Sequence, residues 1–513
     1  MILSLPSSEN SGDEIRRGVL RRVEEVVHRF DWVASTTITG SFLIGNGLEG
    51  ISDIDCVVIV DELNRSRFAA LHSAFESTLT AELARHDYRL QINPTLGPLK
   101  FNEPNLAVLH LMLYSVDAHV DHVIKSPFTC LDWQRSEVVF KQPMQAVYPV
   151  FGLQPRHFVS ARRSIQDYLR DYRKSVVSFR ELICEEQGYK EAGREKPMTV
   201  RDRHEFAYHI VRFLMVNSLK LVRRMNYASG PDELVQQFLD AFPLDGDLVR
   251  PLFAELRDRK HRIRFDPPMD YLDERLEAFV TSFESAFRKT FFEDATSHYV
   301  MRHAPTTWNQ HSGHPRFQGR SDVPAEPIYD ADLSAALRAL EGHSIARVLC
   351  SPLARARQTL EAIHSHHPLP PIEFDDRWLE IDYGGCEGLD SAQARHKFPR
   401  LFEAWSQGED AKFPHGENTH DVLRRATSAS AHYWNTGANT LTCTHNVVMR
   451  CLVGKALGVP AEKWHLLKIP HLRPLLFRQT KNFGWFLDLE EDLEREIFSN
   501  FVGQKASPQS QAA

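Results

Sequence analysis

HYVMRHAPT, residues 298–306, is the stretch that decides the fold class of the C-terminal part of the chain. Its apolar run, His298 to Met301, has the length and composition of a short buried strand. This strand leads directly into Arg302 and His303. The two side chains therefore stand at the carboxyl end of a strand, which is where open α/β sheets bind their ligands.

Two later stretches repeat the arrangement of a short apolar strand followed by polar side chains. One strand precedes SPLARARQT (351–359), which places Arg355 near the start of a helix. Another forms part of LTCTHN (441–446), which delivers His445 to a strand end. Because helix-compatible segments separate the strands, the pattern predicts a parallel, doubly wound sheet covered by helices in a three-layer α/β domain. Neighbouring strands would bring the arginines and histidines into one pocket.

The residue types in this predicted pocket suit a dianionic phosphate. Arginine guanidinium groups bind phosphate oxygens in a bidentate manner and stay charged at any working pH. A histidine can attack phosphorus and become phosphorylated on nitrogen. A second histidine, in its protonated form, would stabilise charge on the transferring group. The residues therefore predict phosphoryl transfer to a histidine.

The C-terminal segments resemble the histidine phosphatase superfamily, the phosphoglycerate mutase-like fold. Arg302-His303 is similar to the opening motif of that family, and FQGRSD (317–322) is similar to its phosphate-side loop. The stretch 351–359 matches its Ser-Pro-Leu-x-Arg-Ala-x-Gln-Thr motif, and LEIDYG (379–384) resembles the segment that holds its proton donor. Ala304 and Asn446 depart from the pattern, because each stands where the family usually has glycine beside a histidine.

The resemblance implies a role for each matched residue. His303 would be the nucleophile, and Glu380 would be the acid that protonates the leaving alcohol. Other matched residues would bind the phosphoryl group or the substrate: Arg302, Arg355, His445, Gln318, Gly319 and Ser351. The resemblance implies a small soluble phosphomonoester as substrate and no cofactor for this domain. No obvious second basic cluster follows Glu380, which favours hydrolysis over mutase chemistry.

A group of residues near the N-terminus predicts a different chemistry. Gly40-Ser41 follows one predicted strand, and Asp53 and Asp55 alternate on the next. Alternate positions place both carboxylates on one face of a strand. Two such carboxylates repel one another unless a divalent cation lies between them, which suits Mg²⁺ bound to a nucleoside triphosphate. The Gly-Ser turn would allow backbone N–H groups to approach the phosphates.

These N-terminal residues resemble the motif of the nucleotidyltransferase superfamily of DNA polymerase β type. The resemblance implies that Gly40 and Ser41 bind nucleotide and that Asp53 and Asp55 bind metal. The family adds a third carboxylate on a later strand, but the predicted strand Leu106 to Tyr114 has none, and His110 occupies an inward-facing position. Asp117, or Asp121, just beyond this strand, is the candidate for the third ligand. The domain is therefore either an active nucleotidyltransferase or a nucleotide-binding module without turnover.

Length and composition predict the organisation of the whole chain. A chain of 513 residues exceeds what one hydrophobic core supports. We expect an α/β nucleotidyltransferase-like domain over 1–150, a helical section over 151–295, the phosphatase domain over 296–500 and a disordered tail over 501–513. In the helical section, the shortage of helix breakers predicts one helical segment from Ser160 to Glu186.

Charge and hydropathy narrow the function classes. The formal net charge of −7 argues against general adhesion to nucleic acid or to an anionic membrane. No apolar run of ~18 residues and no secretory leader is visible, so we expect a cytoplasmic protein with no membrane partner. The favoured interpretation is a bifunctional enzyme that uses a nucleoside triphosphate and a small phosphorylated metabolite. The alternatives are a phosphatase regulated by a catalytically silent nucleotide-binding domain and a nucleic-acid end-processing protein.

Overall fold

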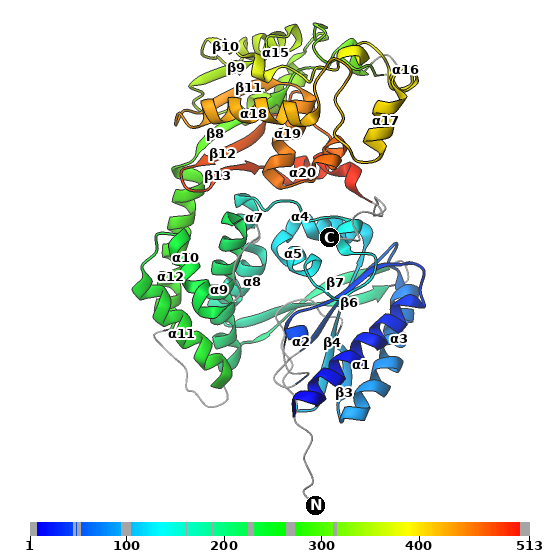
Figure 1. Cartoon of the computed structure of the whole chain (residues 1–513). Coiled ribbons are helices and arrows are strands. Elements are labelled where there is room, and N and C mark those ends of the chain that lie inside the picture. Colours follow the sequence, from blue (N-terminus) through cyan, green and yellow to red (C-terminus); the bar gives the residue numbers. More distant parts are fainter. Residues whose placement is uncertain are drawn as a thin grey trace, which may run out of the picture. The chain divides into compact units, whose positions relative to one another are not determined.

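The computed structural model describes residues 8–44, 48, 53–93, 104–160, 162–185, 188–223, 230–262, 272–310 and 315–502. The chain divides into two compact units, and Figure 1 labels the elements of both. Unit 1 comprises Met1–Val150, His157–Ser282 and Phe501–Ala513, and unit 2 comprises Phe151–Arg156 and Phe283–Asn500. Most of the expected helical section therefore belongs to the same compact unit as the N-terminal sheet.

A five-stranded sheet in the order β3-β4-β2-β1-β5 forms the N-terminal part of unit 1. Its strands are β1 (Val33–Thr39), β2 (Ile54–Val60), β3 (Arg89–Asn93), β4 (Leu106–Ser115) and β5 (Val139–Lys141). β2 runs antiparallel to β1 and parallel to β4, so Asp55 pairs with Thr39 on one side and with His110 on the other. The register of β2 thus places Asp55 beside the histidine of β4.

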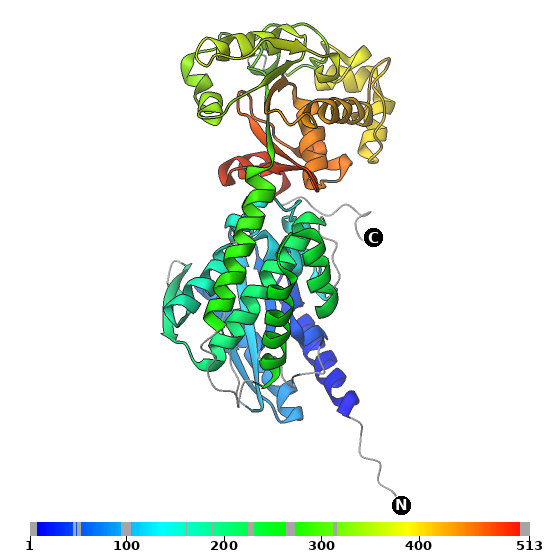
Figure 2. The same ribbon diagram turned by 90° about the vertical axis from the view of Figure 1, so that its left-hand side faces the viewer.

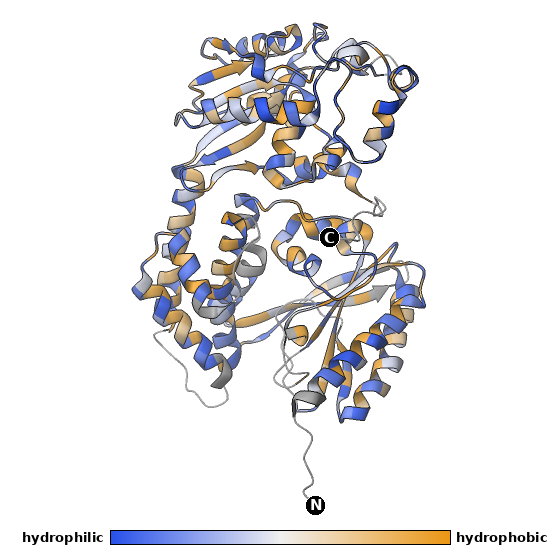
Figure 3. Ribbon diagram, in the orientation of Figure 1, coloured by the Kyte–Doolittle hydropathy of each residue, from blue (hydrophilic) through white to orange (hydrophobic). Residues whose placement is uncertain are grey.

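Two long helices cover this sheet. α1 (Ser8–His28) and α3 (Arg65–Leu83) lie side by side in Figure 1. Val19, Val23 and Val27 of α1 are buried at helical spacing in one cluster with Leu71 and the strands of the sheet. Figure 3 shows hydrophilic residues along the same helices, as a half-buried helix requires. The shorter helices of this region are α2 (Ser41–Ile44), α4 (Val116–Lys125), α5 (Pro127–Gln134) and α6 (Met144–Val147).

The prediction of one helical segment from Ser160 to Glu186 is wrong. After α7 (Pro155–Ser160) and α8 (Arg162–Lys174), Ser175 adopts a positive φ of 55°, and the chain enters a hairpin of two strands. These are β6 (Val176–Glu185) and β7 (Gly188–Pro197). The β-branched and aromatic residues at the start of β6 favour a strand. The Asp171 carboxylate also accepts hydrogen bonds from the Ser178 N–H and hydroxyl groups, at 2.7 and 2.6 Å, and so fixes the turn.

Helices complete unit 1 after this hairpin. They are α9 (Val200–Val222), α10 (Pro231–Ala241), α11 (Gly246–Arg262) and α12 (Leu272–Arg288), the last of which continues into unit 2. Across the described parts of the chain, none of the helices has both the length and the apolar character needed to cross a membrane.

Unit 2 is built on a six-stranded sheet in the order β10-β9-β11-β8-β12-β13. Its strands are β8 (Thr296–Arg302), β9 (Arg347–Cys350), β10 (Ile372–Phe374), β11 (Thr440–Thr444), β12 (Leu475–Thr480) and β13 (Gly484–Asp488). The first four run parallel, whereas β12 and β13 add an antiparallel edge. Because β11 lies between β8 and β9, the three strands that lead to Arg302, Arg355 and His445 are neighbours.

Helices cover both faces of this sheet, as the three-layer prediction requires. Tyr299 and Met301 of β8 pack in one apolar cluster with residues of α14 (Asp330–Leu340) and α15 (Ala354–His364). On the opposite face of β8, His298 stacks on Trp434 of α18 (Thr419–Trp434), with ring centroids 4.9 Å apart. Figure 2 shows the yellow-green and the orange helices apart from each other on the two sides of the strands.

A short segment from far upstream also belongs to unit 2. Within Phe151–Arg156, the Gly152 N–H donates to the carbonyl oxygen of Leu457 at 2.6 Å. A Cβ atom at Gly152 would lie 2.8 Å from the Leu457 backbone, so only glycine allows this approach. Phe151 stacks on Phe498 at 4.2 Å between ring centroids. The segment is therefore an integral part of the packing of unit 2.

Candidate active sites

His303 follows the carboxyl end of β8 and is 2% exposed. Its Nδ1 atom lies 2.6 Å from the carbonyl oxygen of Ala304. Because a carbonyl only accepts, Nδ1 carries the ring proton, and the lone pair stands on Nε2. Burial, and then the charge of Arg355, lowers the pKa of His303 well below its usual range. The ring is therefore a neutral imidazole with a nucleophilic nitrogen at Nε2.

Arg355 joins the predicted parts of the site. Its Nη1 and Nη2 groups donate to the carbonyl oxygens of Ser321 and Gly319, at 2.9 and 2.8 Å, and so hold the loop that carries Gln318. Its Nε group faces the His303 Nε2 atom at 3.2 Å. The side chain is fully buried, and burial lowers the pKa of Arg355 to about 10. The arginine therefore stays charged at neutral pH.

His445 occupies the predicted second-histidine position at the end of β11. Its Nδ1 accepts from Arg355 Nε at 3.3 Å, and its Nε2 donates to the Ser351 hydroxyl at 2.7 Å. Burial, and then the charge of Arg355, lowers the pKa of His445 well below its usual range. The ring of His445 is therefore neutral in this arrangement, whereas the predicted protonated form concerns the site with a phosphoryl group bound. Negative charge on a phosphoryl group beside it would favour the protonated form.

A cavity of about 280 Å³ opens onto these residues. It is lined by Arg302, His303, Asn309, Pro315, Arg316, Phe317, Gln318, Gly319, Glu380, Tyr383, Ser391 and Asn446. Two buried donors on this lining, Arg302 Nε and Gln318 Nε2, have no hydrogen-bond partner among the described residues. A buried donor without a partner costs roughly 1–3 kcal/mol. Two such donors beside a nucleophilic histidine indicate a binding place for an anion.

Glu380 also lines this cavity, as its predicted role requires. Its Oε1 atom accepts from the backbone N–H groups of Ile381 and Val447 at 3.0 and 3.2 Å, whereas Oε2 is 3.4 Å from the Val447 nitrogen. Oε2 is therefore the less engaged of the two carboxylate oxygens. Arg425 donates to the carbonyl oxygens of Leu379 and Glu380 at 2.6 and 3.0 Å, which fixes the backbone here.

Sequence reasoning missed two contributors to this site. Arg425 holds the Glu380 backbone from α18, and His471 holds His303: His471 Nδ1 donates to the His303 carbonyl oxygen at 2.6 Å. Burial, and then the charge of Arg302, lowers the pKa of His471 to about 3. His471 lies in a loop before β12 rather than at the end of a parallel strand, so the pattern that identified His445 could not identify it.

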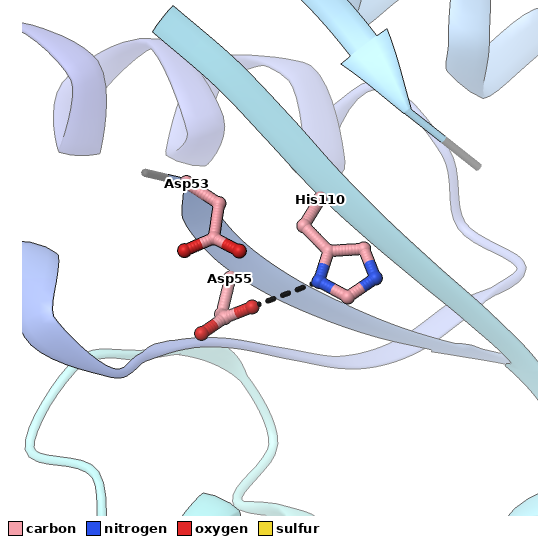
Figure 4. Close-up of side chains that lie close together, drawn as sticks. All are labelled: Asp53, Asp55 and His110. Carbon is pink, nitrogen blue, oxygen red and sulfur yellow. Dashed lines mark hydrogen bonds and ion pairs between the residues drawn. The ribbon is translucent and has the colours of Figure 1, made fainter. Parts of the chain in front are cut away.

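The N-terminal candidates come together at one end of β2. Figure 4 shows the side chains of Asp53, Asp55 and His110 close to one another. One potential ligand atom from each lies within 4.8 Å of the others, and His110 Nδ1 lies 3.0 Å from Asp55 Oδ1. Two carboxylates and an imidazole form a donor set that fits a divalent cation.

The Gly-Ser turn lies against this cluster, as predicted. Gly40 has a φ of 84°, and a Cβ atom there would lie 2.6 Å from Asp55 Oδ2. Glycine is therefore required by both the backbone conformation and the space. Ser41 begins α2 and is exposed.

Asp117 is not brought to the cluster. β2 and β4 run parallel and pair from Asp55 with His110 to Val60 with Ser115. Asp117 lies in the first turn of α4, just beyond Ser115, at the opposite end of the sheet from Asp55. Asp121, one turn further along α4, is likewise at that end. The expectation that either supplies the third metal ligand is corrected, because β4 points its carboxyl end away from the cluster, whereas His110 of β4 lies beside Asp55.

Two family models match parts of this chain. Residues 298–487 match the family model described as Histidine phosphatase superfamily (branch 1), and residues 20–104 match the model described as Nucleotidyltransferase domain. A probable phosphoglycerate mutase, GpmB of Salmonella choleraesuis (strain SC-B67), is 29% identical over 172 residues, which are 32% of this chain and 75% of the relative.

Solved structures also align with this chain, each covering 38% of it. Bacillus stearothermophilus YhfR is 26% identical and covers 38% of this chain and 97% of its own, with a TM-score of 0.35. The alpha-ribazole phosphatase from Shigella flexneri is 20% identical and covers 38% of this chain and 96% of its own, with a TM-score of 0.33. From the two family models, residues 298–487 are a domain of the histidine phosphatase superfamily, and residues 20–104 are a nucleotidyltransferase domain.

Proposed function

We propose that unit 2 hydrolyses a small soluble phosphomonoester through a phosphohistidine at His303, without a cofactor. The observation that carries this proposal is the position of His303 Nε2. It is an unprotonated ring nitrogen in contact with Arg355, at a cavity where buried donors of Arg302 and Gln318 find no partner among the described residues. Those donors would bind the phosphoryl oxygens, and the neutral imidazole would face the phosphorus.

In the first step, the Nε2 lone pair of His303 forms a bond to phosphorus as the bond from phosphorus to the ester oxygen breaks. Glu380 transfers the proton on Oε2 to that oxygen, and the alcohol leaves. Arg302, Arg355, Gln318 and His445 stabilise the negative charge on the transferring group. The hydrogen bond from Nδ1 to the Ala304 carbonyl group keeps the ring in the reactive tautomer.

In the second step, the Glu380 carboxylate takes a proton from water, and the water oxygen attacks phosphorus. The bond from phosphorus to Nε2 breaks, its electron pair returns to the His303 ring, and inorganic phosphate leaves. Glu380 is again protonated, so the cycle closes. Each proton and each electron pair is accounted for by residues of this chain and by water.

Hydrolysis is favoured over mutase chemistry by the charge on the cavity wall. Among the described residues that line the cavity, the cationic ones are Arg302 and Arg316. Arg316 is exposed and donates to the Gly388 carbonyl oxygen at 3.3 Å. A mutase must also hold the second anionic group of its substrate through a complete phosphoryl exchange. One exposed arginine would bind that second anionic group only weakly. Water, in contrast, can enter the cavity and attack the phosphoenzyme.

We propose that unit 1 transfers a nucleotidyl group from a nucleoside triphosphate, so that the chain is bifunctional. Asp53 and Asp55 would hold a divalent cation, which sequence considerations identify as Mg²⁺, and such a cation neutralises charge on the triphosphate. The turn at Gly40-Ser41 would place backbone N–H groups near the phosphates. An acceptor oxygen would attack the α-phosphorus, and pyrophosphate would leave. Both substrates are soluble metabolites, which is consistent with a cytoplasmic enzyme.

The second candidate is a phosphatase regulated by a catalytically silent nucleotide-binding unit. One observation favours it: His110 stands where relatives of the domain carry a third carboxylate, and Asp117 and Asp121 do not reach the cluster. The third candidate, nucleic-acid end processing, is disfavoured by the net charge of −7.

The full chain tests these proposals in one assay series. A panel of phosphorylated metabolites is screened for phosphate release, with and without each nucleoside triphosphate, while pyrophosphate release is followed in parallel. Brief incubation with ³²P-labelled substrate should leave label on the protein that is lost in acid and retained in alkali, as a phosphohistidine is. Absence of any such label from both wild type and Glu380→Gln would contradict the covalent mechanism. The regulatory candidate would be favoured if a nucleoside triphosphate increased phosphate release from every phosphorylated substrate tested while no pyrophosphate was released.

A further inference from the structure

His110 is the feature of the N-terminal site that the proposed function does not use. It lies on β4 at the position paired with Asp55 of β2, so the two side chains lie next to each other on adjacent strands. In Figure 4 the Nδ1 atom of the ring points toward the Asp55 carboxylate, 3.0 Å from Oδ1. The imidazole nitrogen is thus aimed into the same space as the two carboxylates.

The spacing of these atoms fits ligands of one metal ion. Two donors that lie about 2.1 Å from a metal at right angles are separated by about 3.0 Å, a geometry that the bond lengths for imidazole nitrogen and carboxylate oxygen permit. The observed separation of His110 Nδ1 from Asp55 Oδ1 is 3.0 Å. Asp53 offers a third oxygen, and the three ligand atoms all lie within 4.8 Å of one another.

The composition of the set decides which cation it prefers. Mg²⁺ is a small hard ion that takes oxygen ligands and retains water, whereas imidazole nitrogen suits the first-row transition metals. Replacing a third carboxylate by a neutral imidazole also reduces the formal charge of the protein ligands from −3 to −2. The lower charge weakens the binding of Mg²⁺, which is held mainly by electrostatic attraction. It weakens the binding of a transition metal less, because such an ion also forms a strong bond to nitrogen.

We propose that His110 is the third protein ligand of the N-terminal site, and that the site therefore binds Mn²⁺ or Co²⁺ in preference to Mg²⁺. The proposal rests on the divalent-cation site of the proposed nucleotidyltransferase unit and refines its metal. In binding the ion, Nδ1 exchanges its hydrogen bond to Asp55 for a bond to the metal, and the ring proton moves to Nε2. Gly40 leaves the other Asp55 oxygen accessible, because it has no Cβ atom on that side.

The experiment uses the full chain and each metal alone as probe. Pulsed electron paramagnetic resonance of bound Mn²⁺ should show coupling to a directly bonded ¹⁴N nucleus, and His110→Asp should abolish that coupling. Calorimetry should show that His110→Asp raises the affinity for Mg²⁺ relative to that for Mn²⁺ by about tenfold, since the variant has three carboxylates. His72→Asp, at a half-buried position of α3, is the matched control and should change neither measurement.

The outcomes separate this inference from the proposed function. If Mn²⁺ binds to wild type without nitrogen coupling, and His110→Asp leaves the preference between Mg²⁺ and Mn²⁺ unchanged, His110 only orients Asp55 and the inference is overturned. The divalent-cation site itself would then stand. If neither ion binds to wild type, the metal site and the proposed chemistry of unit 1 fail together. Thermal unfolding followed by circular dichroism shows that each variant is folded before its metal affinity is compared.

Discussion

The Nε group of Arg355 lies 3.2 Å from Nε2 of His303 and 3.3 Å from Nδ1 of His445. One guanidinium edge therefore contacts both histidines, while its two terminal nitrogens hold the loop at Gly319 and Ser321. This arrangement makes a planar group with several donors necessary at position 355. Lysine has the charge and three N–H donors, but all three lie on one nitrogen and cannot reach the acceptors that the Nε, Nη1 and Nη2 groups of the planar fork contact.

Arg355→Lys is therefore expected to lower kcat/KM for any phosphomonoester by about 10²- to 10³-fold, the usual cost of removing one donor to a developing anion. Steady-state kinetics with p-nitrophenyl phosphate provide the measurement. Arg357→Lys, two residues further along α15, is the matched control and should remain close to wild type. Wild-type kinetics in Arg355→Lys would show that charge alone is sufficient there.

His303→Ala should abolish turnover, because it removes the nitrogen that is placed to form the phosphoenzyme. Glu380→Gln should behave differently, because it removes a proton donor rather than the nucleophile. We expect it to cost about 10²- to 10⁴-fold with alkyl phosphates and much less with p-nitrophenyl phosphate, whose leaving group needs little protonation. Comparison of kcat for the two ester types is the test. Equal losses for both would exclude Glu380 as the acid.

Acidification should destabilise unit 2 through its histidines. Burial lowers the pKa values of His298 and His471 to about 3, and those of His303 and His445 well below the usual range. Below about pH 6.5 these side chains bind protons in the unfolded chain but not in the folded one. Stability is therefore fully present above pH 6.5 and falls as the pH drops, by about 1.4 kcal/mol per pH unit for each histidine.

Urea unfolding of unit 2 at pH 7.5, 6.0 and 5.0, followed by loss of phosphatase activity and by tryptophan fluorescence, measures this dependence. His303→Gln lacks the nucleophile and is therefore followed by tryptophan fluorescence alone; it removes one of the four groups and should reduce the slope accordingly. A free energy of unfolding that stays constant between pH 7.5 and 5.0 would mean that the imidazoles are protonated in the folded protein.

The phosphatase activity should survive EDTA, because arginines, histidines and Gln318 supply the groups around the phosphoryl site.

Asp53→Asn and Asp55→Asn should each weaken triphosphate binding in the presence of a divalent cation by more than the ~10-fold that loss of an outer-shell partner costs. The same variants should retain wild-type phosphatase kinetics. Asp117→Asn is the control for calorimetry, since Asp117 lies at the other end of the sheet; equal losses in all three variants would contradict the assignment.

Gly152→Ala should destabilise unit 2 by about 1–3 kcal/mol, since a Cβ atom there would meet the Leu457 backbone at 2.8 Å. Gly193→Ala is the matched control, because a Cβ atom at that position of β7 meets nothing within 4 Å. Thermal unfolding of both variants, read out by residual phosphatase activity, is the measurement. A Tm for Gly152→Ala equal to that of wild type would show that the segment can shift at no cost.

The sequence predicted the parts of the structure that depend on local pattern. Arg302, His303 and His445 follow short apolar strands directly, and a parallel sheet aligns such strand ends by geometry alone. The approach of Gly40 to Asp55 was predictable for a similar reason, because only glycine accepts that turn. The sites were therefore identifiable from motifs in which chemistry and strand position coincide.

Other features depend on partners that are distant in sequence. The strand that begins at Val176 is stabilised by pairing with β7. The helix before it ends where Ser175 adopts a positive φ, and the residue type serine does not predict that conformation. His471 contacts His303 from a loop, which no periodicity marks. The failure of Asp117 as a ligand follows from the direction of β4 relative to β2, and a parallel register cannot be read from either strand separately.

The inclusion of Phe151–Arg156 in unit 2 has a consequence for how the protein is made and how it can be divided. During synthesis this segment leaves the ribosome before residues 157–282. Its packing partners in unit 2 are therefore made only after that part of unit 1 has been synthesised. The polypeptide passes from one unit to the other at residues 150/151, 156/157, 282/283 and 500/501. A single protease cut after residue 282 would therefore not release an intact phosphatase. The fragment that begins at residue 283 would still pack against Phe151–Arg156, and this segment is covalently part of the other fragment.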